Sequence, residues 1–332
     1  MSRRYRAALV GYYGFGNLGD ELLLRASLEA LGRCGVSRED VVILSNDPEA
    51  TMREHGVASV NRWQMGAVCR ALASSDTLLL GGGGLFQDST SLRSCLWYWG
   101  VVRLARLCGA RPWALGQSIG PLRRRAARFL TRDALRSCSV LQLRDEPSLE
   151  WAGRLGLEAM RGADLALTLQ PCLATPHDEG ERLLVNLRPA EGIGRIVDLA
   201  AGYVAACPGE AVGVALAEED RALLEKLRAE GRLRLSRVVR VTGLEDAAAL
   251  WGGACRAVGM RLHFAVLSAL FGTPLAVLPY APKTAAFGAW VGAPLDGEGR
   301  PTRPLLPQSA EEIRRDVDGL CRGALGEENF QR

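Results

Sequence analysis

Residues 7–21 read A-A-L-V-G-Y-Y-G-F-G-N-L-G-D-E, and this stretch decides the fold class. Its first part, residues 7–11, is a short apolar run that is typical of a β-strand. The glycine-rich loop after it leads into residues 21–33, where leucines recur at the spacing of one helix face. A strand, a glycine-rich turn and an amphipathic helix in this order predict a parallel sheet covered by helices.

The same alternation continues along the rest of the chain. Apolar runs such as T-L-L-L (77–80) are what a parallel sheet buried on both faces requires. We therefore expect an α/β protein of two doubly wound, Rossmann-like domains, with ligands bound in a cleft between them. Strands are expected at residues 7–11, 41–45, 58–61, 77–80, 112–115, 140–143, 183–187, 211–216, 238–241, 256–259 and 275–279, and helices at residues 21–33, 93–107, 123–136 and 147–155.

The chain length and one polar segment indicate where the domains divide. At about 150 residues per domain, 332 residues suggest two domains. Residues 170–181 contain two prolines, a glycine and an acidic cluster, which is typical of a linker. We expect an N-terminal domain over residues 1–172, a linker at about 173–181 and a C-terminal domain over residues 182–332.

Composition excludes several classes of protein. The formal net charge is +4, from 41 basic and 37 acidic residues, which is too small to indicate a nucleic-acid binder. No apolar run reaches the length of a membrane-spanning helix, and no signal peptide is recognisable, so we expect a cytoplasmic protein. The nine cysteines are scattered without a C-x-x-C pair, and the three histidines stand far apart. We therefore expect neither a disulfide framework nor a metal site.

The loop after the first strand is compatible with three kinds of structure. Residues 14–19, G-F-G-N-L-G, match the dinucleotide fingerprint, and Asp47 could serve as its acidic partner. The match begins three residues beyond the strand end at Gly11, however, which disfavours a dinucleotide. Asn17 and Asp20 are good helix-capping residues, so a purely structural turn is a second interpretation. We favour a third, a loop that binds another kind of ligand.

Four consecutive glycines, residues 81–84, follow a very apolar strand, residues 77–80. Their backbone entropy cost indicates either positive φ angles or close approach of a ligand to the main chain. Close packing of two loops is the structural alternative. Gln87 and Asp88 come next, and we expect them at the rim, with donors and acceptors suited to a sugar.

The segment G-Q-S-I-G (116–120) matches the nucleophile elbow of α/β-hydrolases. Ser118, Asp164 and His263 even follow one another in the order that such a triad requires. Pro121, however, stands where the helix of a hydrolase should begin with free backbone N–H groups. A hydrolase is therefore disfavoured.

Cationic side chains follow several of the expected strands. Arg144 and Arg188 each stand at a strand end, which in a doubly wound sheet faces the ligand crevice. A solvated arginine–aspartate pair is the alternative for Arg144. Arg261 and His263 stand where a strand gives way to a helix, a junction that favours anions, and Lys283 opens the next helix. A lone histidine beside an apolar helix can also be a capped core residue.

Taken together, these segments resemble the polysaccharide pyruvyl transferase family. The motifs that carry the resemblance are G-Y-Y-G-F-G-N-L-G-D-E, G-G-G-G-L-F-Q-D, G-Q-S-I-G-P, L-R-D, M-R-L-H-F and P-Y-A-P-K, in this order. The sequence is most similar to the ketal-pyruvyltransferases that modify secondary cell-wall polymers for S-layer anchoring. The resemblance implies a GT-B-like fold with an N-terminal acceptor side and a C-terminal phosphoenolpyruvate side. It also implies transfer of pyruvate from phosphoenolpyruvate to a sugar as a 4,6-ketal, with release of phosphate and no further cofactor. In similar members the acceptor is N-acetylmannosamine in a lipid-linked disaccharide.

The residue types fit this chemistry. Phosphoenolpyruvate carries a carboxylate and a phosphate, so its pocket needs several cations. His263 is the expected proton donor, and Asp20 or His263 itself could act as the base. The expected phosphoenolpyruvate ligands are Arg144, Arg261, Lys283 and Arg188, and the expected acceptor-binding residues are Phe15, Asn17, Gly82, Gly83, Gln87 and Asp88.

A lipid-linked acceptor would bring the protein to the inner face of the membrane. Residues 93–107 carry Trp97, Tyr98 and Trp99 among arginines, and residues 123–136 add six more arginines, a mixture that suits an interfacial contact. An ordinary domain face with buried aromatic side chains is the equal alternative. Two rival functions also stay open. One is a glycosyltransferase that uses nucleotide-sugars, and the other is a saccharide-binding protein without catalysis.

Overall fold

The computed structural model describes residues 4–89, 91–170, 182–297 and 299–326, so the expected linker at 173–181 lies outside the described residues. The chain forms two compact units. The N-terminal unit comprises Met1–Phe15, Leu23–Thr168 and Ala310–Arg332, and the C-terminal unit comprises Gly16–Leu22 and Leu169–Ser309.

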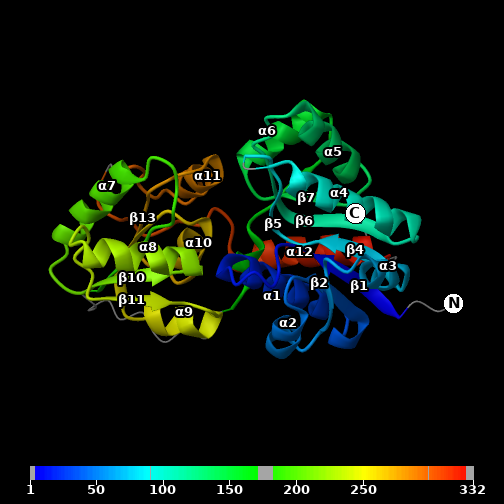
Figure 1. The fold of residues 1–332 in the computed structure, drawn as a ribbon, viewed down its shortest axis with the longest axis horizontal. Helices are drawn as coiled ribbons and strands as arrows, with labels where there is room; N and C mark the ends of the chain where they lie inside the picture. Colours follow the sequence, from blue (N-terminus) through cyan, green and yellow to red (C-terminus); the bar gives the residue numbers. More distant parts are fainter. Residues whose placement is uncertain (1–3, 90, 171–181, 298, 327–332) are drawn as a thin grey trace. The chain divides into compact units, whose positions relative to one another are not determined.

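The N-terminal unit is built on a parallel sheet (Figure 1). The strand order is β3-β2-β1-β4-β6-β7-β8, and β5 pairs with β6. The order reverses direction between β1 and β4, and such a switch point is where doubly wound sheets bind ligands. The strands are β1 (Tyr5–Val10), β2 (Val41–Ser45), β3 (Ala58–Asn61), β4 (Ser75–Leu80), β5 (Gly83–Phe86), β6 (Arg111–Ile119), β7 (Leu141–Leu143) and β8 (Met160–Arg161).

The helices of this unit have clear local causes in the sequence. Both α2 and α6 are capped by an aspartate whose side chain accepts a hydrogen bond from a backbone N–H, and both have a proline within the first two helical positions. Both end at a left-handed glycine, Gly56 and Gly156. The helices are α1 (Leu18–Arg33), α2 (Pro48–His55), α3 (Met65–Ala73), α4 (Arg93–Leu107), α5 (Arg125–Leu135), α6 (Glu146–Leu155) and α12 (Ala310–Leu325), with 3-10 turns at Arg38–Asp40 and Leu165–Thr168. The first residues of α1, up to Leu22, belong to the C-terminal unit.

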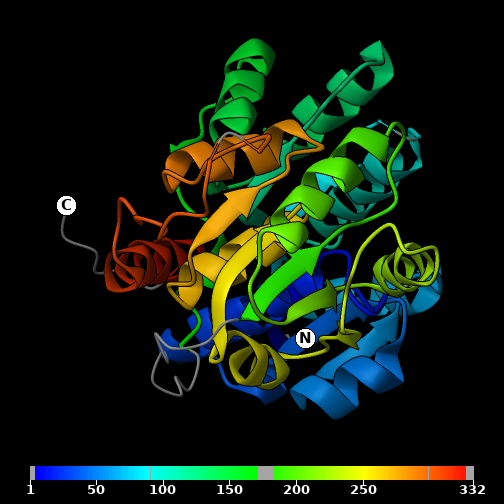
Figure 2. The ribbon, with the colours of Figure 1, turned by 90° about the vertical axis from the view of Figure 1, so that its left-hand side faces the viewer.

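The C-terminal unit repeats the same architecture around five parallel strands (Figure 2). The strand order is β11-β10-β9-β12-β13, so its switch point lies between β9 and β12. The strands are β9 (Arg182–Asn186), β10 (Ala211–Ala215), β11 (Arg237–Arg240), β12 (Ala254–Gly259) and β13 (Leu275–Val277). The helices are α7 (Gly194–Ala205), α8 (Glu218–Ala229), α9 (Leu244–Trp251), α10 (Leu262–Leu270) and α11 (Pro282–Trp290).

These observations confirm the predicted fold class of two doubly wound α/β sheets. Every strand expected from the sequence is present, with ends shifted by a few residues at most. Two further strands, β5 and β8, were not expected. Over the part of the chain that the structure describes, no helix is long and apolar enough to cross a membrane.

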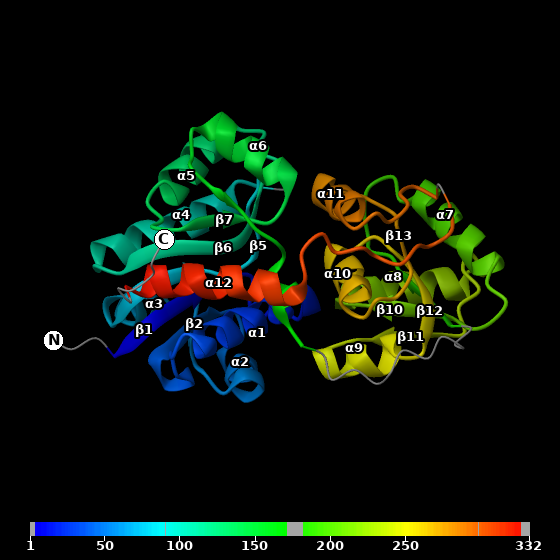
Figure 3. The ribbon, with the colours of Figure 1, turned by 180° about the vertical axis from the view of Figure 1, so that it is seen from behind.

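The last helix, α12, departs from the expected domain boundaries because it packs on the N-terminal unit rather than the C-terminal one. Figure 3 shows α12 in red alongside α1 in blue. The Arg33 guanidinium at the end of α1 donates to both carboxylate oxygens of Asp318, at 2.9–3.1 Å. Arg314 Nε donates to the carbonyl oxygen of Thr168 at 2.7 Å. The N-terminal unit therefore includes chain from both sides of the C-terminal unit.

The aromatic residues of α4 pack inward. Tyr98 is buried in the core of the N-terminal unit, and Trp97 and Trp99 pack against that core. Trp99 Nε1 also donates to Asp133 of α5 at 2.8 Å. For these three rings the structure therefore favours the second interpretation from the sequence, an ordinary domain face with buried aromatic side chains.

Candidate functional site

Two loops directly follow the carboxyl ends of β1 and β4, the strands that flank the switch point of the N-terminal sheet. They are the loop after Gly11 and the glycine run that starts at Gly81. Both glycines lie against the buried ring of Tyr13: a Cβ at Gly11 would lie 2.3 Å from Tyr13 Cζ, and one at Gly81 would lie 1.8 Å from Tyr13 Oη. Gly83 has a φ of +122°, so the glycine run serves both loop packing and an unusual backbone conformation.

The residues after the glycine run are tied into the protein. Gly83 belongs to strand β5 rather than to an open loop. From the sequence we expected Asp88 at the rim. The structure shows instead that it is buried, with 1% of its surface exposed. Its carboxylate accepts from the backbone N–H groups of Arg123 and Arg124, at 2.7 and 2.8 Å, just before the start of α5. Gln87 is half-buried and accepts from the N–H of Ser89 at 3.0 Å. Their acceptor-binding roles stay predictions.

The serine of G-Q-S-I-G does not occupy a nucleophile elbow. Ser118 lies within β6, whereas a hydrolase serine sits on a turn between a strand and a helix. Its hydroxyl donates to Asp145 and accepts from Arg144 Nε at 2.8 Å. The Ser118 hydroxyl therefore helps hold the end of β7 against β6.

Arg144 stands at the end of β7, and its side chain is 3% exposed. Its guanidinium donates to Asp164 at 2.6 Å and lies 3.9 Å from Asp145. The alternative of a solvated ion pair is therefore wrong, because the pair is buried. A buried guanidinium needs such carboxylate partners, and here it links the ends of several strands. Its binding of phosphoenolpyruvate stays a prediction.

In the C-terminal unit, Arg261 follows β12 at the switch point. It makes a two-pronged ion pair with Asp220, at 2.6 and 2.7 Å, and a further contact with Glu219 at 2.7 Å. Burial acts to lower the pKa of Arg261, but the hydrogen bonds and charges of Asp220 and Glu219 outweigh it and raise that pKa. The Asn186 side chain accepts from the N–H of Arg261 at 3.0 Å. Arg261 is thus a fixed cation that is already matched by two carboxylates.

Arg188 and Lys283 are the other cations expected in this unit. Arg188 lies just beyond β9, donates to the Tyr280 hydroxyl at 3.0 Å and stacks over the Tyr280 ring at 4.9 Å. In the part of the chain that the structure describes, no carboxylate forms an ion pair with Arg188. Lys283 lies in the first turn of α11, behind Pro282. Arg144 and Arg261, by contrast, each form an ion pair with a carboxylate.

His263 lies against the start of α1 within the C-terminal unit. A Cβ at Gly19 would lie 2.0 Å from His263 Nδ1 and 2.5 Å from its Cγ, so only glycine fits there. The adjacent Leu18 N–H donates to the Leu216 carbonyl at 3.0 Å. The structure thus brings together the two most specific motifs of the sequence, G-N-L-G-D and M-R-L-H-F.

The two other polar residues of that segment are Asn17 and Asp20. Asn17 donates its side-chain amide to the Asp20 carboxylate, next to Gly19. Asp20 lies in the first turn of α1, where a negative charge is favoured by the helix dipole. Phe15, by contrast, belongs to the N-terminal unit, where it stacks on Tyr12.

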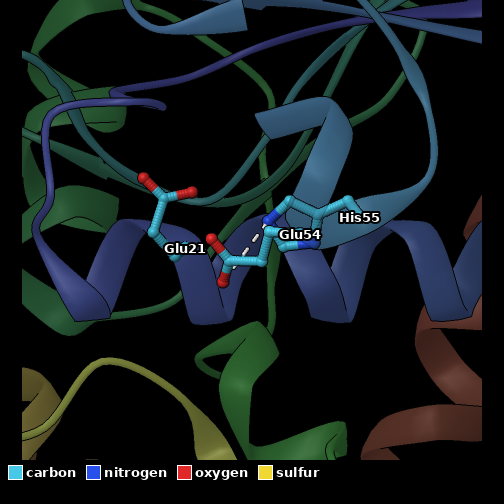
Figure 4. A group of neighbouring side chains, drawn as sticks. All are labelled: Glu21, Glu54 and His55. Atoms are coloured by element: carbon cyan, nitrogen blue, oxygen red, sulfur yellow. Dashed lines mark ion pairs between the residues drawn. The ribbon is translucent and has the colours of Figure 1, made fainter. Parts of the chain in front are cut away.

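One further group contains a histidine. His55 ends α2, and its Nε2 lies 3.8 Å from the half-exposed carboxylate of Glu54 (Figure 4). Glu21, drawn with them, lies in the first turn of α1. Acidic groups of this kind are common without an ion, so they carry no metal assignment. The expectation of no metal stays a prediction.

The sequence reasoning missed the carboxylates that hold the cations. Glu219 and Asp220 open α8 directly after β10, and an acidic first turn at the carboxyl end of a strand was the available signal. It also missed Arg62, which follows β3 and lies among aromatic rings. The dipeptide Arg62-Trp63 at a strand end was the signal there.

Solved structures with the same architecture include several proteins that handle nucleotide-sugars. HepE from Anabaena, in complex with UDP-glucose, is 14% identical with a TM-score of 0.53, over 96% of this chain and 94% of that one. UDP-GlcNAc 2-epimerase from Methanocaldococcus jannaschii is 12% identical with a TM-score of 0.59, over 95% and 98%. A glycosyltransferase from Rickettsia africae is 11% identical with a TM-score of 0.55, over 97% and 89%. At such low identity these similarities establish a GT-B-like fold and no ligand.

The sequence comparisons give the family. Among curated proteins, none matches this sequence. The profile of the family described as polysaccharide pyruvyl transferase matches residues 17–282, from the G-N-L-G-D segment to the residue before Lys283. Because the match spans most of the chain, the protein belongs to the polysaccharide pyruvyl transferase family.

Proposed function

We propose that the protein transfers pyruvate from phosphoenolpyruvate to two hydroxyls of a cell-wall polysaccharide sugar, forming a 4,6-ketal and releasing phosphate. The family membership supports pyruvyl transfer to a polysaccharide. The single observation that best supports the mechanism is the close packing of the His263 ring against Gly19, because this contact joins the two most specific motifs at one place. Following the sequence resemblance, the proposed acceptor is N-acetylmannosamine of a lipid-linked disaccharide at the inner face of the membrane.

The proposed reaction needs one proton donor and balances without a redox partner. His263 protonates the methylene carbon of phosphoenolpyruvate, which becomes a methyl group, and the adjacent carbon becomes an oxocarbenium-like centre. One sugar hydroxyl attacks that centre and gives up its proton. The second hydroxyl then displaces phosphate and closes the ketal. Asp20, beside Gly19, or the deprotonated His263 accepts the hydroxyl protons.

The proposed donor pocket relies on cations at strand ends and helix starts. Arg188 and Lys283 are the main ligands for the phosphate and carboxylate of phosphoenolpyruvate. Arg261, already matched by Asp220 and Glu219, is proposed to add charge and to fix the end of β12 beside His263. The role of Arg144 as a further phosphoenolpyruvate ligand stays a prediction.

Acceptor-dependent phosphate release tests this proposal. The substrates are phosphoenolpyruvate and a synthetic N-acetylmannosamine-containing acceptor, and the product is examined for the ketal by mass spectrometry. We expect His263→Ala to lower kcat by about 10²–10⁴-fold, the usual worth of a general acid. We expect Lys283→Met to raise KM for phosphoenolpyruvate. The chain has one other lysine, so Lys226→Met on the exposed face of α8 is the matched control and should change neither constant.

Each outcome separates the parts of the proposal. Release that survives in His263→Ala would keep the reaction and remove His263 as proton donor. Absence of release from the folded wild type, together with turnover of a UDP-sugar or GDP-sugar, would favour a glycosyltransferase instead. Saccharide binding without any turnover would indicate a binding protein.

A further inference from the structure

Three consecutive strand ends of the N-terminal sheet carry a group of aromatic and polar side chains. The loop after β1 contributes Tyr12 and Phe15, Asn46 follows β2, and Arg62 and Trp63 follow β3. We call this group the aromatic platform. These strands are neighbours in the sheet, and carboxyl ends are the ligand-binding edge of a doubly wound fold.

Two rings of the aromatic platform are exposed although they are large and apolar. Tyr12 is 45% exposed and Trp63 is 57% exposed. Tyr12 and Phe15 stack with their centroids 3.9 Å apart and their planes 9° apart. Exposed aromatic rings that gather at a ligand-binding edge indicate a binding surface.

The exposed rings are fixed in place. Trp63 Nε1 donates to Asn46 Oδ1 at 2.8 Å, and the Asn46 amide donates to the Gly14 carbonyl at 3.2 Å. The edge of Trp63 also packs against Trp97 at 6.1 Å between centroids. A ring that is held before a ligand arrives loses little freedom on binding, so this arrangement favours affinity.

A buried positive charge lies among these rings. Arg62 is 3% exposed, and its guanidinium carbon lies 4.0 Å from the ring centroid of Trp97 and 5.3 Å from those of Phe15 and Trp63. It donates to the Gly11 carbonyl at 2.8 Å and to the Tyr98 hydroxyl at 3.4 Å.

Among the residues that the structure describes, this charge has no carboxylate partner. Within residues 4–89, 91–170, 182–297 and 299–326, no carboxylate forms an ion pair with Arg62. In the same ranges the Nε of Arg62 has no hydrogen-bond acceptor. The two other strand-end arginines that are buried, Arg144 and Arg261, each have carboxylates at 2.6 Å. Contact with aromatic faces offsets only part of the cost of burying a cation. The aromatic platform therefore carries a positive charge that no carboxylate of the described residues neutralises through an ion pair.

We propose that the aromatic platform is a saccharide subsite selective for a negatively charged pyranose, one that bears a carboxylate or a phosphate. The apolar face of the sugar ring stacks on Tyr12, Phe15 or Trp63, and the charge of Arg62 attracts the acidic group. The inference deepens the proposed function, on which it rests, by giving the chemical class of a sugar in or next to the acceptor unit. Screening is weak there because Arg62 is buried.

Binding without phosphoenolpyruvate tests this subsite independently of pyruvyl transfer. The probes are glucose, glucuronate and glucose 1-phosphate, which share a pyranose ring and differ in the charged group. Saturation-transfer NMR on the full-length protein gives each Kd. We expect both charged probes to bind at least about tenfold more tightly than glucose, and the tighter of the two identifies a carboxylate or a phosphate as the natural group.

Variants assign the binding to the aromatic platform. Trp63→Ala removes an exposed ring and should weaken the binding of all three probes by about 2–10-fold. Arg62→Met should bring the three affinities close together, whereas Arg62→Lys should keep the preference for charged probes. Phe129→Ala removes an exposed ring from α5 of the same unit and is the matched control, with no expected change.

Two results would overturn the subsite. One is equal affinity of the wild type for the three probes. The other is charge-selective binding that neither Trp63→Ala nor Arg62→Met alters. Phosphate release with a neutral acceptor, combined with equal probe affinities, would leave the proposed function standing and remove this inference. If Arg62→Met does not fold, the Trp63→Ala and Arg62→Lys results still decide.

Discussion

Gly19 determines where the imidazole of His263 can lie. The ring occupies the space that a side chain at Gly19 would fill. A methyl group at position 19 would lie 2.0 Å from Nδ1 and 2.5 Å from Cγ of His263. Moving the tip of the ring alone cannot relieve this steric clash, so the whole imidazole must rotate away. The glycine thus has a steric role that is separate from any ligand contact of the loop.

Gly19→Ala should therefore lower kcat for phosphate release by about 10²-fold or more, as loss of a positioned general acid would. The fold should persist, because Gly19 lies in the first turn of a helix where alanine is well tolerated. Gly32→Ala is the matched control on the same helix, since a Cβ there meets nothing within 4 Å. It should leave kcat unchanged and raise stability by about 0.5–1 kcal/mol. Wild-type kcat in Gly19→Ala would contradict the positional role.

At this scale the sequence could locate cations but not their partners. Arg261 was predictable because it follows an apolar strand, which is a local pattern. Its partners Asp220 and Glu219 precede it by 41 and 42 residues, and only the folded sheet brings β10 and β12 into one edge. Whether a buried arginine has a carboxylate partner depends on such long-range neighbours. Arg261 has two partners, and Arg62 has none among the described residues.

The helix α12 completes the N-terminal unit through one apolar face. Ile313, Val317, Cys321 and Ala324 are buried on it, with the spacing of successive helical turns. Cys321 accordingly has a raised pKa, because of its hydrogen bond with Cys34 and its burial. The Arg33–Asp318 ion pair adds a specific contact at the surface.

Ile313→Ala should destabilise the N-terminal unit by about 2–5 kcal/mol, as other large-to-small core changes do. Urea unfolding followed by hydrogen exchange measures both the size and the place of the effect. Arg315→Ala on the exposed face of α12 is the control and should stay within about 0.5 kcal/mol of the wild type. Faster exchange confined to the C-terminal unit would show that α12 does not belong to the N-terminal core.

The elements that the sequence predicted are those with a continuous apolar or periodic pattern. Strands β2 and β4 each contain an unbroken apolar run, V-V-I-L and L-L-L, so length and composition suffice. Strand β5 begins with two glycines, which have low strand propensity, and it forms because β6 offers an edge to pair with. Strand β8 has two residues and no pattern to read.

For the whole molecule, the uneven distribution of charge matters more than the net charge of +4. Six exposed arginines lie between residues 123 and 136, on and beside α5. Arg125, Arg128 and Arg132 share one face of that helix, around the exposed ring of Phe129. Such a face attracts anionic surfaces.

Vesicle sedimentation should therefore bring down more protein with phosphatidylglycerol than with phosphatidylcholine. The binding should weaken as salt is raised, because screening shortens the range of the attraction. Arg125→Gln combined with Arg132→Gln should reduce sedimentation severalfold. Arg195→Gln combined with Arg315→Gln removes the same charge from α7 and α12 and should have little effect. Equal sedimentation with both lipids would refute the membrane contact.

The return of α12 also has a consequence for the order in which the protein can be made. Arg314 contacts Thr168, which precedes it by 146 residues, so the N-terminal unit stays incomplete while the ribosome translates the C-terminal unit. At 5–20 residues per second, this interval lasts roughly 7–30 s. During that time the surface that α12 later covers is exposed on the nascent chain. A chaperone that shields apolar surface would find its binding site there, and slower translation of the C-terminal unit would lengthen the exposure.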